Sequence, residues 1–227
     1  MNDLIISVDG PSGSGKERIA KYIANKYNLY HLDSGLLYRR LTYLILKKKI
    51  NFNNKNELFF YLNSLTCLSL KKHKTLRKEV ISKQTSIIAT IPIVRKFINN
   101  QQKLIVKKIL KSKKGCVIDG RDIGSKVFKN AKIKLFIKVK PEIRAKRRHK
   151  QLIEQGEKSI YSRILKDINL RDKNDKNRVV SPLIVPKKAI IIDNSYSFKN
   201  TIHQIYSFKK IIKLYGSKSK NSKNYSF

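Results

Sequence analysis

Acidic side chains, cysteines and long apolar runs are all scarce in this chain of 227 residues. The only cysteines, Cys67 and Cys116, lie far apart in the sequence, which predicts reduced core thiols and no disulfide. Neither they nor the four histidines have the spacing of metal ligands. No apolar run approaches the roughly 20 residues of a membrane-spanning helix, so we expect neither a signal peptide nor a membrane span. These absences favour a cytoplasmic protein without a membrane partner.

The shortage of acidic residues leaves a large positive charge. Fifteen Asp and Glu face 52 Lys and Arg, which gives a formal net charge of +37. Such a charge is typical of proteins that bind nucleic acids. The lysines are scattered, however, and the residues with A/T-rich codons (Lys, Asn, Ile, Tyr and Phe) are all abundant. We therefore favour mutational bias and expect no specific nucleic-acid partner, only weak non-specific binding of RNA.

A glycine-rich loop follows the first apolar run, residues 4–8, and leads into a helical pattern of apolar residues. The loop, residues 9–16, reads DGPSGSGK, and its glycines at 10 and 15 with lysine at 16 fit a phosphate-binding loop. Glycines let the backbone wrap an anion, whose charge is met by amide hydrogens, the following helix N-terminus and Lys16. A chance glycine-rich turn is the alternative, but strand, loop and helix all fall where the motif needs them. We predict a nucleotide phosphate cradle.

Strand and helix patterns alternate along the rest of the chain, which predicts an α/β fold with a doubly wound parallel sheet. We expect one domain over residues 1–215 and a disordered basic tail over residues 216–227. The later expected strands are a short one that ends at residue 33 and three that cover residues 116–119, 133–137 and 189–193. The expected helices cover residues 34–49, 56–65, 77–90, 92–115, 141–155, 160–174 and 198–214, and Gly115 is expected to end the fourth of them.

Polar residues gather where the expected strands end. Asp33 or Ser34 would cap a helix that carries Arg39 near its N-terminus, so an anion there would meet a helix dipole, a hydroxyl and a guanidinium. An ordinary N-cap and a solvated arginine would explain the same residues equally well. Asp119 ends a buried strand, a common way to hold the hydration shell of Mg²⁺. Residues 120–124 (GRDIG) follow at the carboxyl end of that strand, where open α/β sheets bind ligands.

A third group of charges lies near the end of an expected helix. Arg171, Asp175 and Arg178 fall at positions i, i+4 and i+7, so one helix face would carry all three. A surface ion pair of little energetic weight is the ordinary explanation. Arginines on a mobile segment also suit phosphoryl transfer, in which negative charge spreads over the equatorial oxygens of the transferred group.

Taken together and in this order, four motifs resemble the bacterial cytidylate kinase family: residues 10–16, residues 32–39, residues 119–124, and residues 171–178 followed by Pro182 and Leu183. The resemblance implies a P-loop NTPase-like sheet with a helical insertion that binds the nucleoside monophosphate, about residues 36–100, and a lid, about residues 150–175. It implies ATP-dependent phosphorylation of CMP or dCMP with Mg²⁺ accompanying ATP. We expect a monomer.

The resemblance also implies roles for individual residues, with Lys16, Arg121 and Arg178 as the catalytic ones. The acceptor phosphate would contact Ser34, Arg39, Arg121 and Arg178; the cytosine Ser86, Arg95 and Asp122; the sugar Arg171 and Asp175. Asp119 would hold Mg²⁺ through water. The ATP-binding residues would be Gly10, Pro11, Ser12, Gly13, Ser14, Gly15, Lys16, Glu17, Arg18, Arg144 and Arg148.

Two features depart from the family pattern. Residues 70–77 leave no room for the family's β-hairpin. Glu17 and Arg18 stand where a small residue and a Thr or Ser are expected, so the hydroxyl that would order Mg²⁺ is missing. Glu17 could itself bind the metal, or pair with Arg18 and turn away. We favour the second arrangement, because a carboxylate directed at a phosphate would repel it, and we expect a slow enzyme.

Two alternative functions stay open from the sequence. One is another small P-loop kinase of the UMP/CMP or shikimate type, although Ser86, Arg95 and residues 121–122 disfavour shikimate. The other, from a different class, is a catalytically impaired nucleotide- or RNA-binding protein, which the Glu17–Arg18 pair and the net charge would favour.

Overall fold

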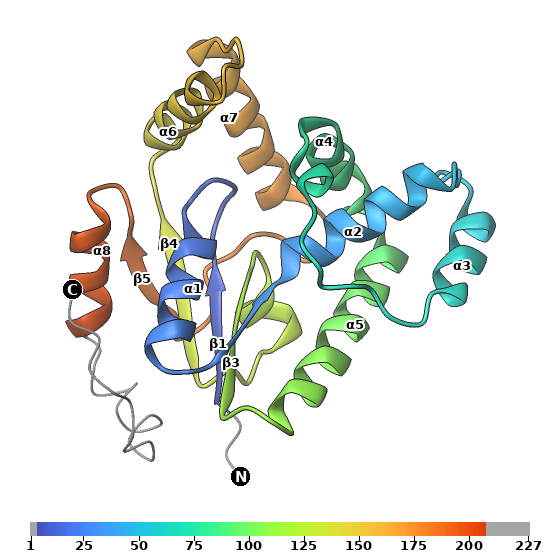
Figure 1. The fold of residues 1–227 in the computed structure, drawn as a ribbon, viewed down its shortest axis with the longest axis horizontal. Coiled ribbons are helices and arrows are strands. Elements are labelled where there is room, and N and C mark those ends of the chain that lie inside the picture. Colours follow the sequence, from blue (N-terminus) through green and yellow to red (C-terminus); the bar gives the residue numbers. More distant parts are fainter. Residues whose placement is uncertain (1–3, 208–227) are drawn as a thin grey trace.

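A computed structural model describes residues 4–207, in which five parallel strands form one central sheet (Figure 1). The strand order is β2-β3-β1-β4-β5, and every neighbouring pair is parallel, which confirms the doubly wound sheet. The chain therefore leaves β1 toward one edge and later returns across it toward the other. Ligands of open α/β sheets bind at such a switch point, outside the carboxyl ends of the strands. The strands are β1 (Leu4–Asp9), β2 (Tyr30–Asp33), β3 (Gly115–Gly120), β4 (Ile133–Lys138) and β5 (Ile190–Asp193).

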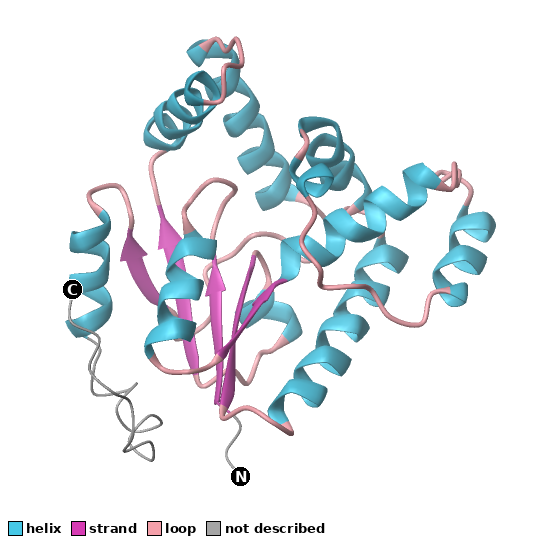
Figure 2. Ribbon diagram, viewed as in Figure 1, coloured by secondary structure: helices cyan, strands magenta, loops and turns pink. Residues whose placement is uncertain are grey.

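Helices connect the strands as the alternating pattern predicts, and two groups of them project from the sheet. One group, α2–α5, separates β2 from β3, and the other, α6–α7, separates β4 from β5. Figure 2 shows the strand arrows pointing toward the α6–α7 pair. The helices are α1 (Lys16–Lys26), α2 (Ser34–Lys47), α3 (Lys55–Ser64), α4 (Glu79–Ile88), α5 (Pro92–Leu110), α6 (Pro141–Glu154), α7 (Tyr161–Asn177) and α8 (Phe198–Ser207), with a 3₁₀ turn η1 (Lys74–Arg77) and a π-helical turn η2 (Ile123–Val127).

Alternate residues of β3 face opposite sides of the sheet, as the two-residue period of a strand requires. Cys116 and Ile118 pack in a cluster with α2 and α5, whereas Val117 packs in a second cluster with α1 and α8. All three side chains are fully buried. The centre of the sheet is therefore covered on both faces, and β3 contains an uninterrupted apolar run, residues 116–118, for that reason.

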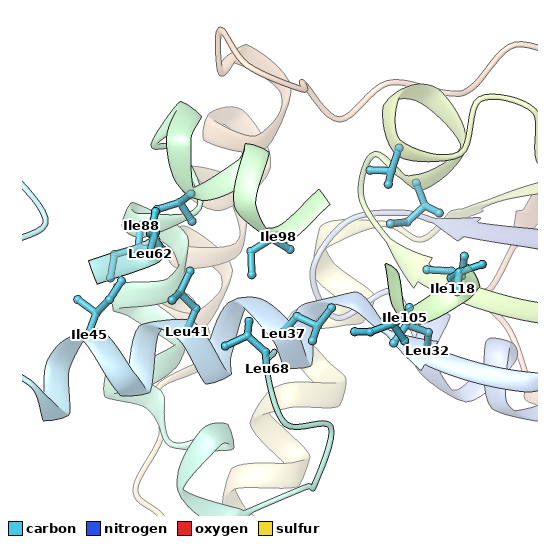
Figure 3. Close-up of a cluster of buried hydrophobic side chains, with 14 of the residues drawn as sticks. Leu32, Leu37, Leu41, Ile45, Leu62, Leu68, Ile88, Ile98, Ile105 and Ile118 are labelled. Atoms are coloured by element: carbon cyan, nitrogen blue, oxygen red, sulfur yellow. The ribbon is translucent and has the colours of Figure 1, made fainter. Parts of the chain in front are cut away.

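The first of these clusters also anchors the α2–α5 group to the sheet. Leu37, Leu41 and Ile45 recur every four residues along α2 and lie fully buried against Leu62 of α3 and Ile88 of α4 (Figure 3). Burying each such side chain contributes about 1.5–3 kcal/mol. The α2–α5 group is held to the sheet through α2, the same helix that carries the predicted phosphate-binding residues.

Several sequence expectations need correction. Gly115 does not end a helix: α5 stops at Leu110, and Gly115 begins β3, where a Cβ would lie 2.5 Å from the Leu4 carbonyl oxygen. The helix expected over residues 77–90 is split at Lys78, whose extended ψ of 146° separates η1 from α4. Cys67 is exposed and not in the core, whereas Cys116 is buried as predicted; both are free thiols.

Other expectations are confirmed or untested. Residues 70–77 contain no strand, which confirms that the family's hairpin is missing. Among the described residues, no helix is long and apolar enough to cross a membrane. The end of the helix expected over residues 198–214 and the basic tail, residues 216–227, lie outside the described residues.

Candidate active site

The glycine-rich loop joins β1 to α1 and is held from outside by Asn194. Gly15 precedes α1 in a left-handed conformation, with φ of 79°, and a Cβ there would lie 2.4 Å from the Asn194 side-chain nitrogen. That nitrogen donates to the Ser14 carbonyl at 2.8 Å, and the Asn194 side-chain oxygen accepts from the Thr201 hydroxyl at 2.7 Å. The loop conformation is thus fixed by a residue that sequence reasoning missed; its only local signal is that it directly follows β5.

Lys16 closes the loop on itself. Its ammonium group donates to the Pro11 carbonyl at 3.0 Å. Burial lowers the pKa of Lys16 to about 8, and the nearby positive charge of Arg121 acts in the same direction. A cation destabilised in this way gains from an incoming polyanion, which is the property a phosphate cradle needs.

Arg144 of α6 links the loop to the helical pair α6–α7. It is almost fully buried, donates to the Ser12 carbonyl at 3.0 Å, and grips the Asp172 carboxylate of α7 with both terminal nitrogens. The predicted ATP-binding Arg144 therefore lies against the loop, whereas Arg148 hydrogen-bonds to Gln151 on its own helix, at 3.1 Å. Asp172, which orients Arg144, was not predicted.

Glu17 turns away from the loop, but not toward the partner expected from the sequence. Its carboxylate pairs with Lys21 at 2.6 Å and with Arg77 of η1 at 2.9 Å. Arg18 instead stacks on the Phe198 ring, 3.8 Å from its centroid, so the expected Glu17–Arg18 pair is wrong. Burial tends to raise the pKa of Glu17, but Lys21 and Arg77 outweigh it and lower that pKa to about 2. The Glu17 carboxylate is thus ionised, and its charge is balanced by Lys21 and Arg77 outside the cradle.

The predicted phosphate-binding residues of α2 are assembled at the ends of β2 and β3. Asp33 caps α2 by accepting from the Leu36 amide at 3.0 Å, and its second oxygen accepts from Arg39 at 2.9 Å. The Ser34 hydroxyl donates to the Asp119 carbonyl at 2.6 Å. The capping question left open by the sequence is therefore settled in favour of Asp33, and Ser34 ties α2 to β3.

Asp175 brings the arginines of two elements together. Its carboxylate lies 2.5 Å from Arg121 Nε, after β3, and 3.4 Å from a terminal nitrogen of Arg178, just beyond α7. Arg178 Nε also donates to the Ser181 carbonyl. Its other terminal nitrogen is buried and has no hydrogen-bond partner among the described residues. A buried guanidinium with a spare donor marks a position where an anion would be stabilised.

Arg95 and Asp122 form a buried ion pair 2.5 Å apart, which connects α5 to the segment after β3. A second terminal nitrogen of Arg95 donates to the Ala89 carbonyl at 2.9 Å. The Tyr38 ring lies 5.6 Å from the Arg95 guanidinium, and the Tyr38 hydroxyl is buried with no partner among the described residues. Burial and the charge of Arg95 lower the pKa of Arg178, so the two guanidinium groups lie within electrostatic reach of each other.

The Ser86 side chain makes its hydrogen bonds within α4 and with α7. It belongs to α4, and its hydroxyl accepts from Arg171 of α7 at 2.8 Å. Arg171 also donates to the Ser82 carbonyl at 3.2 Å. The structure thus joins a residue predicted for the base to one predicted for the sugar, and in doing so joins the two helical groups over the site.

Two buried carboxylates, those of Asp119 and Asp9, lie at the carboxyl ends of β3 and β1. Asp119 lies 2.6 Å from His31 Nε2; burial raises the pKa of Asp119, and the contact with His31 opposes that rise. Asp9 accepts from the amides of Ile123 and Gly124 at 2.8 and 2.7 Å. Burial raises the pKa of Asp9 to about 7, although both amides act to lower it. Neither His31 nor these amide contacts of Asp9 were expected from the sequence.

Comparison with known proteins places the chain in a family. The cytidylate kinase family model matches residues 6–214. Cytidylate kinase of Fusobacterium nucleatum is 36% identical over 230 residues, covering 94% of this chain and 100% of the relative. The enzyme of Clostridium tetani is 38% identical, covering 89% of this chain and 92% of the relative, and that of Mycoplasmopsis synoviae is 36% identical, covering 90% and 97%. The cradle, the paired arginines and these matches agree: the chain belongs to the cytidylate kinase family.

Proposed function

We propose that this protein transfers the γ-phosphoryl group of ATP to CMP or dCMP, giving CDP or dCDP and ADP. Family membership supports the reaction, and one structural observation carries it. A buried Arg95–Asp122 pair lies within electrostatic reach of Arg178, and Arg121, the residue before Asp122, lies within electrostatic reach of the cradle lysine. This arrangement offers cationic donors for two phosphate groups and a polar pair for one base.

On the donor side, the loop backbone and Lys16 hold the ATP phosphates. The amides at the start of α1 and the helix dipole supply partial positive charge, and Lys16 would exchange the Pro11 carbonyl for a phosphate oxygen. Arg144 covers the loop and, through Asp172, makes that cover part of α6–α7. Glu17 is kept out of the site by Arg77 and Lys21.

On the acceptor side, Arg39, Arg121 and Arg178 hold the phosphate of CMP, and an oxygen of that phosphate attacks the γ-phosphorus of ATP in line as ADP leaves. No side-chain nucleophile is required, because the protein positions the two nucleotides and stabilises the charge on the transferred group. Lys16, Arg121 and Arg178 provide most of that stabilisation. Asp33 and Asp175 keep the arginines in place until the substrate arrives.

Arg95 and Asp122 would read the cytosine. A carboxylate accepts from the exocyclic amino group that cytosine has and uracil lacks, and an arginine donates to the ring acceptors. Because both side chains are buried, a base that leaves either of them without a partner is rejected strongly. Arg171 and Asp175 are assigned to the sugar, and Ser86, which accepts from Arg171, is assigned to the base together with Arg95 and Asp122.

Mg²⁺ fits the residues at this edge of the sheet. Among the described residues, no three His, Cys, Asp or Glu side chains are arranged to hold a metal, so most ligands would be water and phosphate oxygens, as Mg²⁺ commonly prefers. Asp119 supplies a buried carboxylate, and we assign it to the metal through water. Bound with ATP, Mg²⁺ would supply positive charge to the β- and γ-phosphate oxygens.

The helical groups and the surroundings of the protein are assigned on the same basis. Residues 36–100 would bind the monophosphate and residues 150–175 would form the lid, as supported by the contacts of Arg171 with α4 and of Arg144 with the loop. We assign the protein to the cytoplasm as a monomer, with weak non-specific RNA binding on the order of 10⁻⁴–10⁻⁶ M at physiological salt.

The test is a coupled assay of ADP release with CMP, dCMP, UMP and AMP, each with and without Mg²⁺. Preference for CMP and dCMP with a Mg²⁺ requirement supports the proposal. Equal rates with UMP would point to a UMP/CMP kinase, and no turnover of any acceptor would point to an impaired nucleotide- or RNA-binding protein. Neither alternative is favoured, because the family model and the curated relatives are those of cytidylate kinases.

A further inference from the structure

The segment that carries Asp122 ends in an unusual turn. Residues 123–127 form the π-helical turn η2, and Asp122 occupies the position that precedes it. At the start of a helical turn the first amides lack partners, and an Asp in that position commonly accepts from them with its own carboxylate. Asp122 makes no such bond; its carboxylate is turned to Arg95.

The missing cap is supplied by Asp9, from the end of β1. One oxygen of Asp9 accepts from the Ile123 amide at 2.8 Å and the other from the Gly124 amide at 2.7 Å. The side chain of Asp9 is fully buried, and the two amides are the first of the turn. The carboxylate therefore performs, across 114 residues of sequence, the task that Asp122 would otherwise perform locally.

We propose that Asp9 is a positioning residue for base selection: by capping η2, it frees the Asp122 carboxylate to face Arg95 and the base. The inference rests on the proposed function of Asp122. It also means that one carboxylate, at the first position of the phosphate loop, fixes the geometry of the acceptor pocket.

Gly124 permits the close approach that this capping needs. A Cβ on Gly124 would lie 2.4 Å from the Ser7 hydroxyl and 3.2 Å from an Asp9 carboxylate oxygen. The Ser7 hydroxyl is buried and has no partner among the described residues, so it serves as a steric neighbour and not as a hydrogen-bonding one. Any side chain at position 124 would push its amide away from Asp9.

The first experiment compares Asp9→Asn with Asp33→Asn. Both residues end strands and accept from a helix-start amide, but Asp33 also holds the phosphate-binding Arg39, whereas Asp9 acts on Asp122. An amide at position 9 can accept from only one of the two N–H groups. We expect Asp9→Asn to lower kcat/KM for CMP by roughly ten- to a hundred-fold, or about 1.4–2.7 kcal/mol. The decrease in kcat/KM for UMP should be several-fold smaller. Asp33→Asn should lower both alike.

The second experiment keeps Asp9 and disturbs its contact. Gly124→Ala should reduce the CMP-to-UMP ratio of kcat/KM as Asp9→Asn does, and adding Ser7→Ala, which removes the nearest obstructing atom, should restore much of that ratio. This rescue does not depend on whether Asp9→Asn folds. A structural role alone would lower activity on both acceptors together.

The outcomes separate this inference from the proposed function. If the unmodified protein does not prefer CMP to UMP, the proposed function fails, and the inference fails with it. If it prefers CMP but Asp9→Asn leaves the CMP-to-UMP ratio unchanged, or raises only the KM for ATP, the inference alone is overturned. If the ratio falls and Ser7→Ala rescues Gly124→Ala, it is supported.

Discussion

The donor and acceptor sides of the site are built in different ways. The cradle is eight consecutive residues, and the contacts of Lys16, Arg144 and Asn194 with it are to backbone carbonyls. The acceptor side is assembled from α2, α5, the end of β3 and the end of α7, and it consists of arginines paired with carboxylates. The cradle is thus organised by backbone conformation, whereas the acceptor pocket is organised by charge pairs that a substrate must rearrange.

This difference predicts different consequences of mutation. A change in residues 10–16 of the cradle alters the handling of ATP and is indifferent to the acceptor, so all monophosphates should suffer alike; Asp9 is the exception, because its carboxylate contacts the segment after β3. A change in the acceptor pocket leaves one member of a buried pair without its partner and should discriminate between bases, because the penalty depends on what the base offers in return.

The largest effect is expected from Lys16→Met. Loss of the Lys16 ammonium group removes a full positive charge that stabilises the transferred phosphoryl group. We therefore expect kcat to fall by roughly a thousand-fold or more with every acceptor, about 4 kcal/mol. Steady-state kinetics with CMP and dCMP measures it. Lys83→Met, which removes an exposed lysine that pairs with Glu79, is the matched control and should stay near the unmodified rate. A loss confined to one acceptor would contradict the backbone character of the donor side.

The next effect tests the acceptor side alone. Asp122→Ala should lower kcat/KM for CMP by a factor of roughly ten to a thousand, about 1–4 kcal/mol, because Arg95 stays buried without its carboxylate and the cytosine amino group loses an acceptor. UMP, which lacks that amino group, should lose far less. Equal losses with CMP and UMP would make Asp122 a structural residue and remove the basis for assigning it to the cytosine.

The same contrast explains what the sequence could predict. The cradle, the five strands and the residues at or just beyond strand ends (Asp33, Asp119 and Asp122) follow from local patterns, because backbone conformation and strand ends depend on neighbours in sequence. The hold of Asn194 on the Ser14 carbonyl spans 180 residues and has no local signature. Asp9 was seen only as the first residue of the loop.

Pairing among charged side chains was the least predictable part. Glu17 was expected to pair with its neighbour Arg18, but it pairs with Arg77 of η1, 60 residues away, while Arg18 stacks on Phe198. Ser86 was grouped with Arg95 and Asp122, but α4 lies where the Ser86 hydroxyl accepts a hydrogen bond from Arg171 of α7. These pairings depend on which helices are in contact in the folded protein, and the sequence periodicity of one helix does not predict its neighbours.

A smaller effect, and a gain, is expected at the departure from the loop motif. Combining Glu17→Gly with Arg18→Thr restores a hydroxyl for Mg²⁺ and should raise kcat by roughly ten-fold, about 1.4 kcal/mol off the barrier, with little change in ATP affinity. Steady-state kinetics across a Mg²⁺ titration measures this. Arg77→Met is the control, since it breaks the same ion pair without adding a hydroxyl. A similar gain in Arg77→Met would trace the effect to release of η1, and a loss of activity in the double variant would mean that Glu17 is a working metal ligand.

The smallest effect is a pH dependence that belongs to the donor side. Burial and the charge of Arg121 lower the pKa of Lys16 to about 8 in the free protein, so half of the lysine is neutral at that pH. The protonated form of Lys16 binds phosphate, and the pH dependence of kcat/KM reports ionisation in the free enzyme. The assay holds CMP far below its KM. Under that condition kcat/KM for ATP should be halved near pH 8 and should then fall by a factor that approaches ten for each further pH unit. Once ATP is bound, its phosphates raise the pKa of Lys16, so kcat at saturating ATP should stay flat through the same range. The two profiles are measured side by side from pH 6.5 to about pH 9.5. A fall in kcat parallel to that in kcat/KM would place the titrating group on the acceptor side, and a flat kcat/KM would show that Lys16 stays protonated without its substrate.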